Sequence, residues 1–93
     1  MNLDKSTKRI DKKVKKGFQG YPEIIISYFG KNTDMATKVI VGFKAEENAE
    51  VLTEQFVTVD DIKIDTTVQS TIVKIIERSG AKTVTLTDGV EQE

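Results

Sequence analysis

Residues 66–80 read TTVQSTIVKIIERSG, the most regular pattern in the chain. Its large aliphatic side chains recur at helical spacing: Val68, Ile72, Ile75 and Ile76. Residues spaced by three or four lie on one face of a helix, so the pattern predicts one amphipathic helix. Such a helix has an apolar face that another layer of structure must cover.

Both ends of this helix carry the expected signals. Asp65 or Thr66 suits the N-cap, because a short oxygen-bearing side chain can accept a hydrogen bond from the first turn. Thr66 with Gln69 also fits a capping box. Gly80 follows the last turn, where a left-handed backbone conformation is wanted. The sequence therefore predicts a helix over residues 66–79.

Strands are predicted before and after the helix in the sequence. Residues 23–30, 36–45 and 51–59 are rich in β-branched and aromatic side chains and are separated by short polar turns. Short turns favour an antiparallel meander. Residues 81–87 alternate between threonine and aliphatic side chains, which predicts a fourth strand, and a turn is expected at residues 88–89.

The element order β-β-β-α-β predicts a single small α+β domain, with the helix as the crossover to the fourth strand. If the fourth strand pairs with the first, the spatial order is 3-2-1-4, which resembles half of a ribonuclease H-like topology. That resemblance implies carboxylates on the first strand, on the helix and after the fourth strand. Glu77 and Asp88 fit the last two positions, but residues 24–29 contain no carboxylate. A two-metal nuclease is therefore not expected.

Composition removes most kinds of catalytic site. The 93 residues include no cysteine and no histidine, so there is no thiolate nucleophile, disulfide or histidine base. The acids Asp60, Asp61 and Asp65 precede the helix and are interpreted as caps rather than as ligands of a cation. We expect no enzyme activity, no catalytic residues, no metal site and no cofactor.

Charge is distributed unevenly along the chain. Residues 1–17 carry seven basic and two acidic side chains, a net charge of +5, whereas residues 18–93 carry seven basic and thirteen acidic ones, a net charge of −6. Residues 1–20 are interpreted as a basic, flexible arm and residues 21–90 as the α+β domain. The arm's candidate contacts with phosphate or with an acidic partner are Lys8, Arg9, Lys12, Lys13, Lys15 and Lys16. Phe18 and Tyr21 follow them and are candidates for stacking on bases.

The sheet face away from the helix is the second candidate surface. If Val39 and Val41 face the helix, Ile40 faces outward. On the first strand either Ile24, Ile26 and Tyr28 or Ile25 and Phe29 remain on the open face. Apolar side chains on an open face are typical of a partner surface. The candidate interface is Ile25, Phe29 and Ile40.

Several short motifs are similar to those of a group of small uncharacterised bacterial proteins. They are the segments Gly20-Tyr21-Pro22, Ile26-Ser27-Tyr28-Phe29-Gly30, Ala36-Thr37-Lys38-Val39 and Ser79-Gly80-Ala81-Lys82-Thr83-Val84. Some members of that group carry a tail with cysteine and histidine that looks metal-binding, and this chain has neither residue. The resemblance implies no activity.

Two function hypotheses follow. We favour a non-catalytic protein-interaction module that self-associates as a homodimer or binds a protein partner. The alternative is an accessory nucleic-acid-binding protein that uses the basic arm. No membrane contact is expected, and a cytoplasmic location is expected because the N-terminus lacks the apolar core of a secretory signal.

Overall fold

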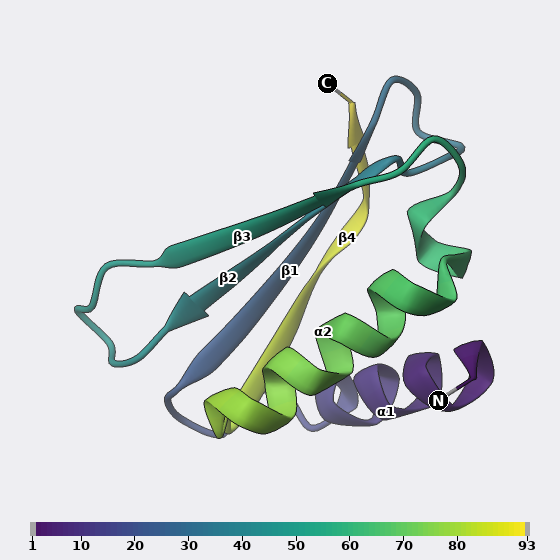
Figure 1. The fold of residues 1–93 in the computed structure, drawn as a ribbon. Coiled ribbons are helices and arrows are strands. Elements are labelled where there is room, and N and C mark those ends of the chain that lie inside the picture. Colours follow the sequence, from purple (N-terminus) through teal and green to yellow (C-terminus); the bar gives the residue numbers. More distant parts are fainter. Residues whose placement is uncertain (1, 93) are drawn as a thin grey trace.

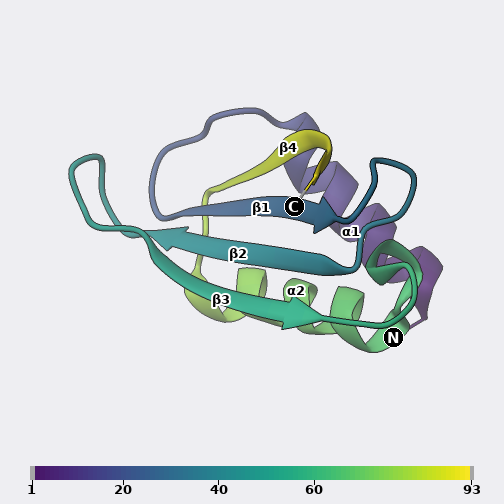
Figure 2. The same cartoon turned by 90° about the horizontal axis from the view of Figure 1, so that it is seen from above.

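The computed structural model describes residues 2–92, apart from the side chain of Asp88. The chain forms one four-stranded sheet with two helices packed on one side of it (Figures 1 and 2). The elements in chain order are α1 Leu3–Lys15, β1 Glu23–Gly30, β2 Lys38–Lys44, β3 Leu52–Val57, the short 3-10 helix η1 Ile62–Ile64, α2 Thr66–Ser79 and β4 Thr83–Gln92.

The strand order is β3-β2-β1-β4, which confirms the predicted order. β1 pairs antiparallel with β2 and parallel with β4, and β2 pairs antiparallel with β3. A helical crossover is needed to bring β4 beside β1 in the same direction, and α2 supplies it. The structure is therefore the expected α+β meander with a crossover helix, with α1 added as a second helix.

The helix α2 begins and ends where the sequence predicted. The Asp65 carboxylate accepts a hydrogen bond from the Val68 N–H at 3.0 Å, and Gly80 has a φ of 66°. The predicted capping box is wrong, because the Gln69 side chain points into the core instead. Its amide donates to the Tyr28 hydroxyl and to the Ile62 carbonyl, both at 3.1 Å. A buried amide needs such partners, and the cap is already supplied by Asp65.

The end of β4 differs from the prediction. A turn was expected at residues 88–89, but the strand continues to Gln92 and pairs with β1 on both sides of a register shift. Ile26 pairs with Leu86 and Tyr28 with Val90, so β4 carries extra residues that form a bulge. Gly89 has a φ of 69°, which a glycine adopts without the steric cost of a Cβ atom.

The core lies between the sheet and the helices. Its buried apolar residues are Ile10, Ile24, Ile26, Tyr28, Ala36, Val39, Val41, Ile62, Val68, Ile72, Val73, Ile76, Ala81 and Val84. The alternation along β1 is thereby resolved: Ile24, Ile26 and Tyr28 face the helices.

The basic segment was expected to be a flexible arm, but in the structure residues 3–15 are the helix α1, packed against α2 and β4. Ile10 is only 4% exposed, and the Ser6 hydroxyl lies 3.2 Å from that of Ser70 on α2. A short helix gains most of its stability from packing an apolar face, and Ile10 with Val14 provides that face.

Candidate functional site

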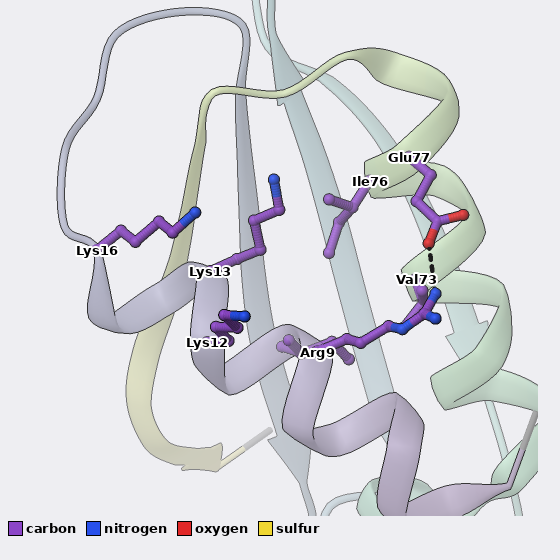
Figure 3. Close-up of a pocket in the computed structure, with 8 residues that line it drawn as sticks. Arg9, Lys12, Lys13, Lys16, Val73, Ile76 and Glu77 are labelled. Atoms are coloured by element: carbon purple, nitrogen blue, oxygen red, sulfur yellow. Dashed lines mark hydrogen bonds and ion pairs between the residues drawn. The ribbon is translucent and has the colours of Figure 1, made fainter.

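The basic residues of α1 gather beside α2. Arg9, Lys12, Lys13 and Lys16 recur at spacings of three and four and line one side of a groove of about 270 Å³ (Figure 3). Val73, Ile76 and Glu77 of α2 line the other side, and Ile10 lies between the two helices. We call this feature the α1–α2 groove.

Charge in the groove is only partly balanced. The Arg9 guanidinium donates to a Glu77 carboxylate oxygen at 2.9 Å, and both side chains are well exposed. Across residues 2–92, leaving aside the side chain of Asp88, this is the only ion pair in the structure. The ammonium groups of Lys12, Lys13 and Lys16 therefore face solvent without a carboxylate partner in the part of the chain that is described.

The six predicted basic contact residues do not all lie on the same face of α1. Four of its members line the groove, whereas Lys8 and Lys15 are exposed and lie outside it. Asp11 lines a different depression, on the other side of Ile10, together with Lys63 of η1. Asp11 therefore lies on a different face of α1 from the groove.

The two aromatic residues after α1 are placed differently from one another. Phe18 is 62% exposed, and its ring centroid lies 5.2 Å from that of Tyr21 in an edge-to-face arrangement. Tyr21 is partly buried, and the Lys44 ammonium lies 5.8 Å from its ring centroid. The Phe18 side chain is thus largely accessible to a partner, whereas the Tyr21 ring already contacts both Phe18 and the Lys44 ammonium group.

The predicted interface residues share the open face of the sheet. Ile25 and Phe29 both lie on the outward face of β1. Ile40 of β2 pairs with Ser27, which lies between them on the same face. All three are partly buried rather than fully exposed. The Lys38 ammonium lies 5.4 Å from the Phe29 ring centroid and covers part of that ring.

A second surface, which the sequence analysis missed, runs along the outer edge of the sheet. β3 is an edge strand, and in the described part of the chain its partner is β2 alone. Three of the most exposed large apolar side chains lie on β3 and just after it: Leu52 is 63% exposed, Val57 67% and Val59 91%. The aliphatic residues within 51–59 were visible in the sequence, but their exposure depends on β3 lying at the edge.

The structure places Tyr28 and two of the three acids that precede α2. Burial raises the pKa of Tyr28 above its ordinary value, and the hydrogen bond from Gln69 acts in the opposite direction. Asp65 caps α2, as the cap interpretation predicted, whereas Asp61 caps the short helix η1, which the sequence analysis did not predict. Asp60 is the N-cap of neither helix, so the cap interpretation is wrong for it. Among the residues described, no three His, Cys, Asp or Glu side chains are close enough to hold a metal ion. The side chain of Asp88 lies outside the described residues.

No helix in the described part of the chain is long and apolar enough to cross a membrane. A scan against protein-family models, a search of curated proteins and a search of solved structures gave no match. The resemblance to the group of small bacterial proteins therefore stays a prediction.

Proposed function

We propose that this domain is a non-catalytic protein-interaction module, and that it self-associates by pairing β3 with β3 of a second copy. The observation that carries the proposal is an edge strand with exposed apolar side chains at both ends. An unprotected edge is a template for a further strand, because its outer N–H and C=O groups lack partners in the sheet.

The hydrogen-bond directions along β3 support this pairing. The Thr58 N–H donates to the Thr37 carbonyl at 2.8 Å, and these residues continue the register in which Lys38 pairs with Val57. In an antiparallel ladder, bonded and non-bonded residue pairs alternate. The N–H and C=O groups of Thr53, Gln55 and Val57 therefore point away from β2, toward an incoming strand.

The two edges of the sheet differ in their protection. β4 is bulged near its end, and at its start the Thr83 hydroxyl accepts from the Gln19 N–H and donates to the Gly20 carbonyl, so the segment after α1 lies against it. Bulges and covering loops are the usual means of blocking an edge. β3 has neither feature, nor does it contain lysine or proline. This contrast favours β3 as the interacting edge.

A two-fold arrangement selects one register. Residues directly opposite each other must lie on the same face of a continuous sheet, so the two-fold axis passes through a residue rather than between two residues. The two residues in the middle of β3 are Glu54 and Gln55. An axis at Glu54 would place two carboxylates opposite each other, which is unfavourable. An axis at Gln55 pairs Thr53 with Val57 and Glu54 with Phe56. We therefore propose the register centred on Gln55.

The open face enters the same assembly. Thr53, Gln55 and Val57 share that face with Ile25, Phe29 and Ile40, as the strand registers require. Pairing through β3 would join the open faces of two copies into one surface twice as wide. The predicted interface residues would then line a surface available to a larger protein partner.

The test uses charge at the proposed two-fold axis. Gln55→Lys places two ammonium groups opposite each other, and Gln55→Glu places two carboxylates there. We expect wild-type protein to sediment as a dimer at tens of micromolar, each variant as a monomer, and an equimolar mixture of the variants as a heterodimer. Gln92→Lys, the same change on β4, is the matched control and should remain dimeric.

Three results would contradict the proposal. They are a monomeric wild type, a Gln55→Lys variant as dimeric as wild type, and a mixture that stays monomeric while each variant is folded. The last result would leave self-association standing but would refute the register. Circular dichroism on each variant shows whether the fold is retained.

A further inference from the structure

The α1–α2 groove is the strongest charged feature that self-association leaves unused. We infer that it binds the phosphate backbone of single-stranded nucleic acid. The inference concerns a different face of the molecule from β3 and does not depend on pairing between copies. It narrows the contact from the whole basic segment to the four cationic side chains Arg9, Lys12, Lys13 and Lys16.

The charge balance favours a polyanion. Four cationic side chains line the groove with one carboxylate, that of Glu77, which already pairs with Arg9. Three ammonium groups therefore remain on one helix face, where they repel one another. A ligand with several negative charges relieves that repulsion and releases its own counterions on binding.

The length of the groove suits several phosphates rather than one. Arg9 and Lys16 are seven residues apart on a continuous helix, which corresponds to a rise of about 10 Å. A strand in duplex geometry carries one phosphate per ~3.4 Å of axis and a more extended single strand carries fewer, so up to about three phosphates fit along the groove. The groove is a surface feature rather than an enclosed cavity.

Negative charge on the body lies away from this row. The turn between β2 and β3, with Glu46, Glu47 and Glu50, projects beyond the end of the sheet where β1 begins, whereas α1 itself lies toward the other end (Figure 2). The connection that carries Phe18 and Tyr21 runs between the two. Asp11, the one acid in the middle of α1, lines the other depression. Among the described residues, Glu77 is the only acid that lines the groove, and its carboxylate is already paired with Arg9.

The exposed Phe18 ring favours a single strand over a duplex. Phe18 follows Lys16 by two residues, so a base attached to a phosphate at the end of the groove can reach it. Bases stack on aromatic rings only when they are unpaired. A groove that tracks the backbone, combined with an aromatic ring beside it, is the usual arrangement of sequence-tolerant single-strand binding.

The experiment compares two matched triple variants. Lys12→Gln, Lys13→Gln and Lys16→Gln remove three charges from the groove, whereas Lys5→Gln, Lys8→Gln and Lys15→Gln remove three from elsewhere on the same helix. Binding of a fluorescent single-stranded oligonucleotide of about 16 nucleotides is measured by anisotropy from about 50 to 200 mM salt. Circular dichroism and thermal unfolding show that both variants remain folded.

We expect wild-type affinity to fall steeply with salt. The groove variant should lose at least about tenfold in affinity at 50 mM salt, and its slope of log K against log salt should fall by about 2, since each single-strand phosphate contact contributes ~0.7. The control variant should keep most of the wild-type affinity and most of the wild-type salt slope. Replacing the three groove lysines by arginine should retain binding, and Phe18→Leu should weaken it roughly tenfold without changing the slope.

Other outcomes overturn the inference. Absence of binding at about 50 mM salt refutes it, and equal loss in the two triple variants shows diffuse attraction to α1 rather than a site in the groove. If a duplex of the same sequence binds as tightly, the assignment to single strands is wrong. If tripolyphosphate or polyglutamate competes as well as the oligonucleotide at equal charge, the groove selects negative charge and not a nucleic acid strand.

Discussion

Replacing Ile10 by alanine tests whether α1 is part of the folded core. Ile10 is a buried aliphatic residue of α1, the helix that packs against α2 and β4. A detached arm would place this side chain in water. A packed α1 and a detached arm therefore predict very different losses of folding free energy for Ile10→Ala.

The expected cost follows from burial. Truncating a buried isoleucine to alanine destabilises a protein by about 2–5 kcal/mol, because both the transfer free energy and the packing are lost. Since a domain of this length has a free energy of unfolding of about 5–14 kcal/mol, the change is a large fraction of the total. At roughly 4–8 °C per kcal/mol, a loss of about 3 kcal/mol lowers the melting temperature by about 12–24 °C.

Urea unfolding followed by circular dichroism measures the free energy of unfolding directly. Lys8→Ala, an exposed change on the same helix, is the control and should alter that free energy by less than about 0.5 kcal/mol. An Ile10→Ala variant indistinguishable from this control would refute the packing of α1. Removal of residues 1–17 should in addition lower the m-value, because less surface would be exposed on unfolding.

Three further substitutions test particular contacts. Gln69→Leu should cost about 1–3 kcal/mol in urea unfolding, because the Ile62 carbonyl and the Tyr28 hydroxyl lose a buried donor; an unchanged midpoint would contradict that bond network. Gly80→Ala should cost about 1 kcal/mol, since φ is 66° but a Cβ atom would meet nothing within 4 Å; a cost above about 3 kcal/mol would mean that space is lacking. Because burial raises the pKa of Tyr28 above 10.0, the unfolded tyrosine ionises first, and the free energy of unfolding should fall as the pH rises above about 10 and be unaffected by this group at lower pH. Tyr28→Phe should remove that part of the pH dependence, and an identical profile in the variant would refute it.

Much of the fold could be predicted because local signals agree with the tertiary arrangement. The stripe in α2, its Asp65 cap and Gly80 each act within a few residues, so the helix ends were predicted correctly. The bulge in β4 could not be predicted, because Gly89 suits a turn as well as an extended strand with extra residues. Only the parallel pairing with β1 selects the second arrangement.

The candidate surfaces were predicted only in part, because they depend on tertiary contacts as well as on local sequence signals. The cationic residues were evident from composition, but their division into a groove set and an outer set requires a helix docked on α2. The few apolar residues of this segment favoured a flexible arm, but Ile10 and Val14 are four residues apart and lie on the packed face of the helix. The exposure of Val57 could not be predicted from alternation, because a strand has the same pattern at the edge and in the middle of a sheet.

The parallel pairing of β1 with β4 also bears on how quickly the chain can fold. Ser27 and Thr87, whose hydroxyl groups lie 3.0 Å apart, are separated by 60 residues in the sequence. The entropy of closing so long a loop must be lost before the contact contributes any stability. Folding rates fall as the average sequence separation of contacts rises, so this chain should refold more slowly than a helical bundle of the same length. The hairpin of β2 and β3 closes only a short loop. We therefore expect the pairing of β1 with β4 to form later in folding than the pairing of β2 with β3.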